Sequence, residues 1–162
     1  MKYITAPWRE EYVRSVFKMT ECIFCRALRL GKDREALILY RGEFNFIILN
    51  RFPYTPGHLM IAPYDHMDSI EKADKKTADE LIDLLKRTLK ILRETYHPHG
   101  FNTGMNLGHS AGAGVADHYH LHVIPRWTGD ANFMPLIGKT KVVIEDIQST
   151  YKKLLPSFHR GG

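Results

Sequence analysis

The sequence His-Tyr-His-Leu-His-Val-Ile, at residues 118–124, has a histidine at every second position of an otherwise apolar run. Successive side chains of a β-strand point to opposite faces of the sheet, so alternate residues share a face at a spacing of roughly 6.6 Å. The pattern predicts a strand over residues 119–125 whose apolar side chains face a core. The opposite face then carries three imidazoles, those of His118, His120 and His122.

The same histidine pattern could arise in two different ways. The strand could face solvent with histidine at its polar positions by chance, but histidine is a rare residue and three at strict alternation argue against chance. The three could instead bind one metal ion. Ligands of one zinc ion lie only about 3–4 Å apart, because metal–nitrogen bonds are near 2 Å. We therefore expect the three histidines to have different roles.

A glycine-rich loop precedes the histidines, with the sequence Gly-His-Ser-Ala-Gly-Ala-Gly at residues 108–114. Glycine lets a backbone approach a ligand closely, and consecutive exposed amides form a site for anions. Such a segment can also be only a flexible turn. Its place just before a row of imidazoles predicts a phosphate-binding loop beside a nucleophile.

Three further apolar runs precede the long helical segment of the chain. Those at 36–40 and 44–49 flank a turn at Gly42 and are typical of a hairpin. The run at 58–62 predicts another strand, which ends at Pro63 because proline cannot donate to a ladder.

A long amphipathic helix is predicted over residues 69–96, because apolar residues recur there at three- and four-residue steps. Its stripe consists of Ala78, Leu81, Ile82, Leu85, Leu89, Leu92 and Tyr96. A short helix beginning at Pro7, a strand at 102–107 and a last helix at 144–155 complete the prediction. Strands joined by short loops, with the helices grouped, are typical of an α+β fold with an antiparallel sheet.

Composition limits the class of protein. A chain of 162 residues is long enough for one domain and too short for two of ordinary size. The formal net charge of +5 suits a polyanionic partner such as a nucleotide, a polyphosphate or a nucleic acid. Basic and acidic residues interleave over 69–96 without a dense basic cluster, which makes nucleic acid a minor candidate. No apolar run approaches the roughly 20 residues of a membrane span, so no membrane partner is expected.

The two cysteines form a pair in Cys22-Ile23-Phe24-Cys25. This spacing is typical of zinc thiolates, but two cysteines cannot complete a tetrahedral site and two more ligands are needed. A redox pair would need a βαβ context that the sequence lacks. Two buried thiols remain an alternative. A single close pair is no disulfide framework and the N-terminus is no signal peptide, so we expect a cytoplasmic protein.

The residues 118–124 match the signature His-φ-His-φ-His-φ-φ, where φ is hydrophobic, and the chain resembles the histidine triad (HIT) family. Residues 50–53 and 56–63 resemble the nucleotide-pocket segment of that family. Residues 125–133, with 8–12, resemble its branch of bacterial diadenosine tetraphosphate phosphorylases. The resemblance implies one HIT-like domain over 1–162, with an antiparallel sheet, a long helix and shorter terminal helices. Its core spans about 22–130, with extensions at 1–21 and 131–162.

The resemblance also implies roles for single residues. His120 attacks the α-phosphate and becomes a nucleotidyl-imidazole, and His122 bonds a phosphate oxygen or the leaving bridging oxygen. Neutral imidazole is nucleophilic near pH 7, and its other nitrogen needs an acceptor, which we expect from the backbone of the glycine loop. Asn50 binds the ribose hydroxyls, and Asn106 a phosphate or the bridging oxygen. The amides that stabilise the transition state belong to Gly112, Ala113, Gly114 and Val115.

Zinc-binding relatives supply a histidine after the proline-containing strand and the first histidine of the triad. Those positions are His66 and His118, which would complete a structural zinc site with Cys22 and Cys25. No organic cofactor is expected. His109 has no firm counterpart; it could contact the distal phosphates or be a polar loop residue, and we favour the second interpretation.

The implied activity is a nucleotidyl transferase or hydrolase that acts on dinucleoside polyphosphates. With inorganic phosphate as acceptor it is a phosphorylase that yields ADP and ATP from diadenosine tetraphosphate. Water as acceptor would make it a hydrolase, and a nucleoside phosphoramidate hydrolase would use the same histidine. A nucleotide sensor or a scaffold is the non-enzymatic alternative. The resemblance also implies a homodimer that packs through the long helix and a strand edge.

Overall fold

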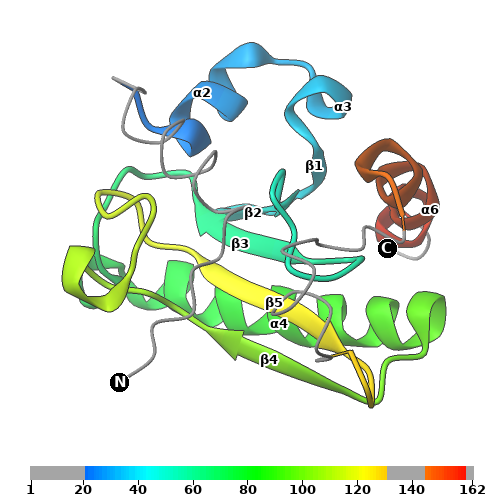
Figure 1. The fold of residues 1–162 in the computed structure, drawn as a ribbon. Helices are drawn as coiled ribbons and strands as arrows, with labels where there is room; N and C mark the ends of the chain where they lie inside the picture. Colours follow the sequence, from blue (N-terminus) through cyan, green and yellow to red (C-terminus); the bar gives the residue numbers. More distant parts are fainter. Residues whose placement is uncertain (1–20, 131–144, 160–162) are drawn as a thin grey trace, which may run out of the picture.

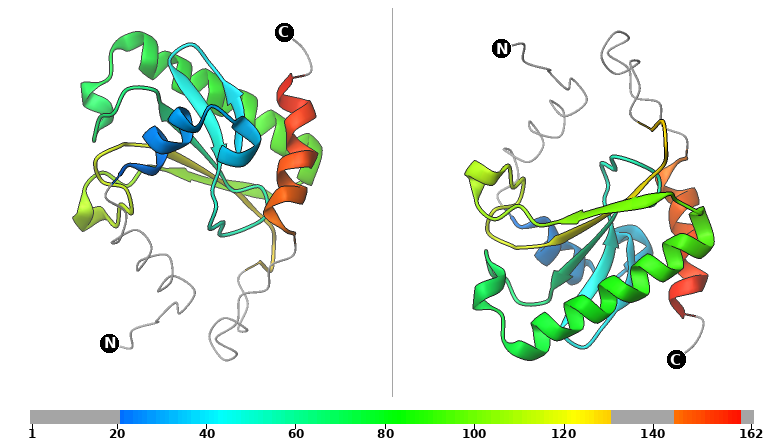
Figure 2. Two further views of the ribbon diagram at one scale, coloured as in Figure 1. Left: turned by 90° about the horizontal axis from the view of Figure 1, so that it is seen from above. Right: turned by 90° about the horizontal axis from the view of Figure 1, so that it is seen from below.

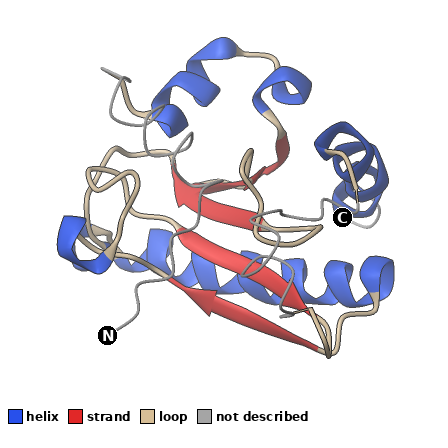
Figure 3. Cartoon of the chain, viewed as in Figure 1, coloured by secondary structure: helices blue, strands red, loops and turns tan. Residues whose placement is uncertain are grey.

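The computed structural model describes residues 21–130 and 145–159. Its five strands form one antiparallel sheet in the order β1-β2-β3-β5-β4, as Figure 1 and Figure 3 show. The strands are β1 (Ile38–Arg41), β2 (Asn45–Leu49), β3 (Leu59–Pro63), β4 (Gly100–Gly104) and β5 (Leu121–Arg126). The helices are α2 (Ile23–Leu30), α3 (Asp33–Ala36), α4 (Lys75–Tyr96) and α6 (Ile147–His159), with short 3-10 turns η1 (Ile70–Lys72) and η2 (His109–Ala111). The predicted α+β class with an antiparallel sheet is confirmed.

The helices lie on different sides of the sheet. Helix α4 packs across β2, β3 and β5, whereas α2 and α3 lie at the opposite side of the molecule in Figure 1. Helix α6 packs against β1, the first strand of the sheet order. Within the described ranges, no helix combines the length and the apolar character needed to cross a membrane.

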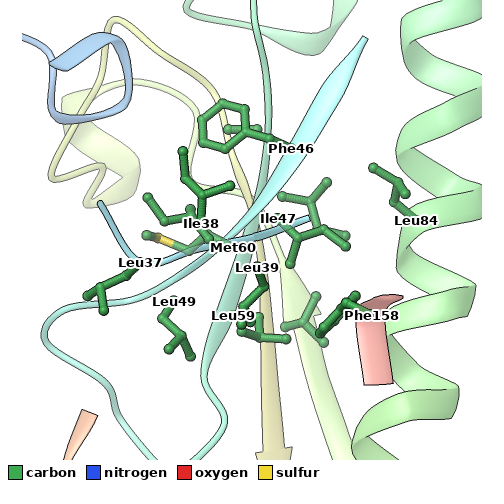
Figure 4. Packing of buried hydrophobic residues seen from close by; sticks show 14 of the residues in the cluster. Leu37, Ile38, Leu39, Phe46, Ile47, Leu49, Leu59, Met60, Leu84 and Phe158 are labelled. Carbon is green, nitrogen blue, oxygen red and sulfur yellow. The ribbon is translucent and has the colours of Figure 1, made fainter. Parts of the chain in front are cut away.

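The core fills the space between the sheet and the helices. Figure 4 shows apolar side chains of β1, β2 and β3 gathered near Leu84 of α4 and Phe158 of α6. Buried residues alternate with half-buried ones along β5. Gly57 has φ +74°, and a Cβ there would meet both Leu92 of α4 and Pro125 of β5 within 3.4 Å. Pro125 and the buried residues of β5 that share its face are therefore on the α4 side, and His122 lies on the other face of the sheet.

The observed strands differ from the predicted ones at their ends. β5 begins at Leu121 rather than at 119, so His118 and His120 precede the ladder. β4 begins two residues before the predicted strand at 102–107 and ends three residues before it. Ala36 belongs to α3, because Leu37 adopts a left-handed φ of 67° and separates that helix from β1. The predicted helix at Pro7 lies outside the described residues.

Helix α4 begins later than predicted, at Lys75, because Asp74 caps it by accepting the Thr77 N–H at 2.8 Å. Its buried side chains are Thr77, Leu81, Leu84, Thr88, Ile91 and Leu92. The predicted stripe was wrong in part, because it merged the core-facing row with a neighbouring row that contains Ile82, which is 46% exposed. It also omitted two threonines that occupy core positions.

The two edges of the sheet differ. At β1, Tyr151 Oη donates to the Ile38 carbonyl at 3.0 Å, and His159 Nε2 lies 3.1 Å from the Leu39 carbonyl. Helix α6, which continues through Pro156 to His159 rather than ending at 155 as predicted, thereby covers this edge. At the opposite end of the sheet, no described strand pairs with the outer edge of β4.

Glu80 of α4 holds the turn between β1 and β2. Its carboxylate accepts backbone N–H bonds from Glu43 (2.6 Å), Phe44 (2.8 Å) and Asn45 (2.7 Å). The side-chain amide of Asn45 donates to the same carboxylate at 2.9 Å. Glycine is required at the turn, because a Cβ at Gly42 would lie 2.9 Å from the backbone carbonyl oxygen of Asn45 and would also displace the Glu80 carboxylate.

We expect Glu80→Ala to lower the free energy of unfolding by about 2 kcal/mol, because several N–H donors lose a charged acceptor. The measurement is urea-induced unfolding followed by circular dichroism. Asp83→Ala is the matched control on the same helix, since its ion pair with Lys86 is exposed to solvent, and it should change stability by less than about 0.5 kcal/mol. Equal losses for the two variants would refute this role of Glu80.

Candidate active site

His120 is a buried histidine with a defined tautomer. Its side chain is 5% exposed, and its Nδ1 lies 3.0 Å from the carbonyl oxygen of His118. Because a carbonyl can only accept, Nδ1 carries the proton and Nε2 keeps its lone pair. Burial lowers the pKa of His120, although its bond to the His118 carbonyl opposes that shift. The ring is therefore a neutral imidazole with a nucleophilic Nε2.

The acceptor for His120 Nδ1 was expected in the glycine loop, and that expectation was wrong. The carbonyl two residues earlier in the chain supplies it, so the tautomer is fixed by the segment that carries the ring itself. The alternative of a strand that turns its histidines to solvent is also wrong, because His118 is fully buried and His120 nearly so.

His122 has the opposite tautomer, which His58 determines. The backbone N–H of Tyr54 donates to His58 Nδ1 at 3.1 Å, so the proton of the neutral His58 ring is on Nε2. That nitrogen lies 2.9 Å from His122 Nδ1 and donates to it. The proton of a neutral His122 is therefore on Nε2. The rings of His120 and His122 pack edge to face with centroids 4.7 Å apart.

His58 is a site residue whose role was not predicted from the sequence. It is fully buried, and the Tyr54 ring stacks on it at 5.1 Å with the planes 16° apart. The available signal was a histidine in the nucleotide-pocket segment at 56–63, directly before an apolar strand. Asn50 lies beside it, with Nδ2 3.4 Å from His58 Nδ1, and Asn50 Oδ1 accepts the Phe52 N–H at 2.9 Å.

The glycine loop follows β4 in the chain, and the last residue of that strand, Gly104, pairs with His122 of β5. Gly108 and Gly112 have φ of 82° and 84°, a conformation that favours glycine. The Gly112 N–H bonds the carbonyl of His109 at 2.9 Å, and the Ala113 N–H bonds that of Gly108 at 3.3 Å. Two of the four amides expected to bind phosphate thus close the loop itself.

The amides of Gly114 and Val115 make no backbone hydrogen bond within the described part of the chain. Asn106 reaches across the loop, with its Nδ2 3.5 Å from the Gly112 carbonyl. His109 lies exposed in η2.

Cys22, Cys25, His66 and His118 come together in a second cluster, whose four ligand atoms all lie within 4.8 Å of one another. Cys22 Sγ is 3.4 Å from His118 Nδ1, and Cys25 Sγ is 3.3 Å from His66 Nδ1. Bonds of about 2.0–2.3 Å to one tetrahedral zinc ion would separate its ligand atoms by roughly 3.3–3.8 Å. The donor set and its spacing therefore fit a zinc ion.

His118 is prepared to be a metal ligand. Its Nε2–H donates to the Pro63 carbonyl at 3.0 Å, so the lone pair is on Nδ1, which faces the two sulfur atoms. Burial lowers the pKa of His118 to about 4 and raises the pKa of Cys22 to about 11. The imidazole is thus neutral at neutral pH, as a ligand must be, whereas the Cys22 thiol needs a cation to ionise.

Comparisons with known proteins agree with this arrangement. The family model of the HIT domain matches residues 32–129. An AP-4-A phosphorylase of Mycobacterium tuberculosis is 40% identical over 128 residues, which are 79% of this chain and 66% of that protein. The chain thus spans about two thirds of that relative's length. An uncharacterised HIT-like protein of Methanocaldococcus jannaschii is 30% identical over 136 residues, 82% of this chain and 98% of that protein.

Solved structures show the same fold. A zinc-bound histidine triad family protein of Mycobacterium smegmatis is 24% identical with a TM-score of 0.69, over 86% of this chain and 94% of that one. A hypothetical histidine triad nucleotide-binding protein of Sulfolobus tokodaii is 27% identical with a TM-score of 0.69, over 85% and 92%. The predicted fold is thereby confirmed.

Proposed function

Because this chain belongs to the HIT domain family, we propose that it is an enzyme that transfers or hydrolyses nucleotidyl groups of dinucleoside polyphosphates, with His120 as the nucleophile. One observation carries the proposal: the 3.0 Å bond from His120 Nδ1 to the His118 carbonyl leaves a lone pair on Nε2 of a buried neutral ring. A group that only binds nucleotides does not require a fixed tautomer at this position, which argues against a sensor or a scaffold.

The proposed reaction has two displacements. In the first, His120 Nε2 attacks the α-phosphorus, the bond to the bridging oxygen breaks with its electron pair left on that oxygen, and His122 Nε2–H donates a hydrogen bond that stabilises the charge of the leaving oxygen. The nucleoside polyphosphate leaves, and the nucleotidyl group stays on His120. The positive charge of the substituted imidazole is stabilised by the His118 carbonyl at Nδ1. In the second, an acceptor attacks phosphorus and His120 leaves.

The glycine loop and the two asparagines would bind the substrate. The amides of Gly114 and Val115, which make no backbone hydrogen bond among the described residues, are the proposed donors to the phosphoryl oxygens, and such preorganised donors contribute on the order of several kcal/mol to the transition state. In this proposal Asn50 binds the ribose hydroxyls. Asn106 binds a phosphate or the bridging oxygen.

The similar mycobacterial protein named AP-4-A phosphorylase supports diadenosine tetraphosphate as the substrate and inorganic phosphate as the acceptor. With this pair, ATP leaves in the first displacement, and phosphate converts the adenylyl group on His120 to ADP. Hydrolysis of the same substrate would release AMP instead. Cleavage of a nucleoside phosphoramidate would use the same nucleophile.

We expect diadenosine tetraphosphate to yield ADP and ATP when the full chain is incubated with inorganic phosphate, with the nucleotides separated by chromatography. His120→Ala should lower turnover on the order of a thousandfold or more, because no other group can carry the nucleotidyl moiety. His109→Ala, a change at an exposed histidine of the same loop, is the control. Unchanged turnover in His120→Ala would exclude the proposal. AMP in place of ADP would indicate a hydrolase, and turnover only of an adenosine phosphoramidate would indicate a nucleoside phosphoramidate hydrolase.

We further propose that the second cluster holds a structural zinc ion through Cys22, Cys25, His66 and His118. The ion would join α2 to the segment before β5 and leave His120 uncoordinated. His118 Nδ1 faces both sulfur atoms, and His66 Nδ1 faces that of Cys25. This arrangement favours a metal ion over a redox pair or two buried thiols.

We expect the chelator-treated protein to take up a single equivalent of Zn²⁺, and Co²⁺ to give the absorption bands of a tetrahedral thiolate site. Cys25→Ser should weaken the affinity by at least about a hundredfold, since even outer partners of metal ligands can cost that much. His109→Ala should bind as the unsubstituted chain does. Tight binding retained in Cys25→Ser would place the metal elsewhere.

The homodimer implied by the family resemblance belongs to the same proposal. Ile82 on α4 is 46% exposed, and the outer edge of β4 is not paired by a described strand. In Figure 2, seen from below, both α4 and β4 lie on the near side of the molecule. An exposed apolar side chain and an open strand edge are two features that a symmetric interface can bury.

We expect sedimentation of the unsubstituted chain at micromolar concentration to give the mass of a dimer. Ile82→Glu should shift the mass to that of a monomer, because a carboxylate would be buried without a partner. Lys76→Glu, on another face of α4, should leave the mass unchanged. A monomeric unsubstituted chain would contradict the proposed dimer.

A further inference from the structure

Phe24 contacts His120 of the candidate active site and His118 of the cysteine–histidine cluster, and it takes no part in the proposed reaction. It lies between the two cysteines in the first turn of α2 and is fully buried. The centroid of its ring is 4.9 Å from that of His120 and 5.1 Å from that of His118. Phe24 is therefore in direct contact with the candidate nucleophile.

The turn that carries Phe24 is held by the metal cluster. Cys22 Sγ and Cys25 Sγ lie 3.4 Å and 3.7 Å from His118 Nδ1, one on each side of Phe24 in the sequence. The Arg26 N–H bonds the Cys22 carbonyl at 3.0 Å and closes the turn. Cys22 and Cys25, two residues of the proposed metal site, thus hold both ends of the segment that places Phe24 against His120.

His118 connects the same cluster to His120 by a second path. Its side chain is a member of the cluster, while its backbone carbonyl accepts the His120 Nδ1–H. That bond selects the tautomer, but a single bond at one ring atom still permits the imidazole to tilt. Phe24 packs against the ring at an interplanar angle of 45° and His122 at 75°, and together they restrict the tilt.

We propose that Phe24 is a positioning residue for His120, and that the cluster of Cys22, Cys25, His66 and His118 seats it there. The direction in which His120 Nε2 points then depends on whether the cluster holds its zinc ion, although the cluster takes no part in the reaction. This inference rests on the proposed function, because it concerns the rate of the first displacement. A nucleophile that is misplaced by about 1 Å slows a displacement reaction by about a hundredfold.

Phe46 supplies a matched control. It is also fully buried in the same core cluster and contacts Phe24 at a centroid distance of 6.3 Å. Its other ring contact among the described residues is with Tyr64, at a centroid distance of 5.7 Å. A residue that acts only through core packing should behave as Phe46 does.

The experiment compares Phe24→Leu and Phe46→Leu in the zinc-loaded full chain. The first readout is single-turnover formation of the nucleotidyl-histidine from diadenosine tetraphosphate, measured over a range of substrate concentrations up to saturation. The second is the imidazole ¹⁵N spectrum of His120 at fixed pH, and the third is the thermal unfolding midpoint. Both variants should lower the midpoint. Only Phe24→Leu should slow the transfer, by about tenfold to a hundredfold with an unchanged KM.

The ¹⁵N spectrum separates positioning from simple loss of stability. The unsubstituted protein should show one protonated and one unprotonated His120 nitrogen, whereas Phe24→Leu should show averaged signals from an exchanging ring. Removal of zinc from the unsubstituted chain by a chelator should produce the same averaging, which tests the role of the cluster even if Phe24→Leu does not fold.

Equal slowing by the two variants, or a His120 spectrum unaffected by Phe24→Leu and by zinc removal, would overturn the inference. Failure of the proposed function looks different. In that case the unsubstituted chain forms no nucleotidyl-histidine, while the ¹⁵N comparison still decides whether Phe24 and the cluster position the ring.

Discussion

The bond between His120 Nδ1 and the His118 carbonyl is the constraint on which the candidate site depends. It is 3.0 Å long and buried, so neither partner can exchange it for water without cost. Because the acceptor is part of the backbone, its position follows from the path of the chain into β5. That path is determined in turn by the side chain of His118, which is held by the Pro63 carbonyl and faces two thiols. One residue therefore links the sheet, the cysteine cluster and the nucleophile.

The two neighbouring imidazoles differ because the backbone orients them differently. A carbonyl at Nδ1 makes His120 an acceptor at Nε2. The Tyr54 N–H makes His58 a donor to His122, and His122 is consequently a donor at Nε2. Both tautomers are thus set by backbone groups, which cannot change protonation state. Two side chains of the same type thereby acquire complementary functions.

The periodicity of apolar residues allowed the α+β class to be predicted. The histidine and cysteine motifs, with the family resemblance, predicted which of these side chains would lie together. The acceptor of His120 could not be predicted, since every residue has a carbonyl and it leaves no mark in the sequence. His58 was missed because its partners are a backbone N–H and a ring 64 residues away.

On α4, hydrophobicity alone cannot separate a core row from an adjacent row, and Thr88 is fully buried although it carries a hydroxyl. The bounds of β4 and β5 shifted because pairing with a neighbour decides where a strand begins. Residues 131–133, part of the resemblance to one branch of the family, lie outside the described residues.

The register of the sheet determines what stands on each side of the His122 ring. Across the sheet, Ile48 pairs with Met60, Met60 with His122, and His122 with Gly104. Paired residues in an antiparallel sheet share a face, so the His122 ring stands between an apolar residue and a glycine. Among the described residues, a Cβ at Gly104 would meet no atom within 4 Å, so none of them fills the space beside this position. The apolar side of the row packs beside the ring, and the glycine side is the one from which the proposed substrate would approach.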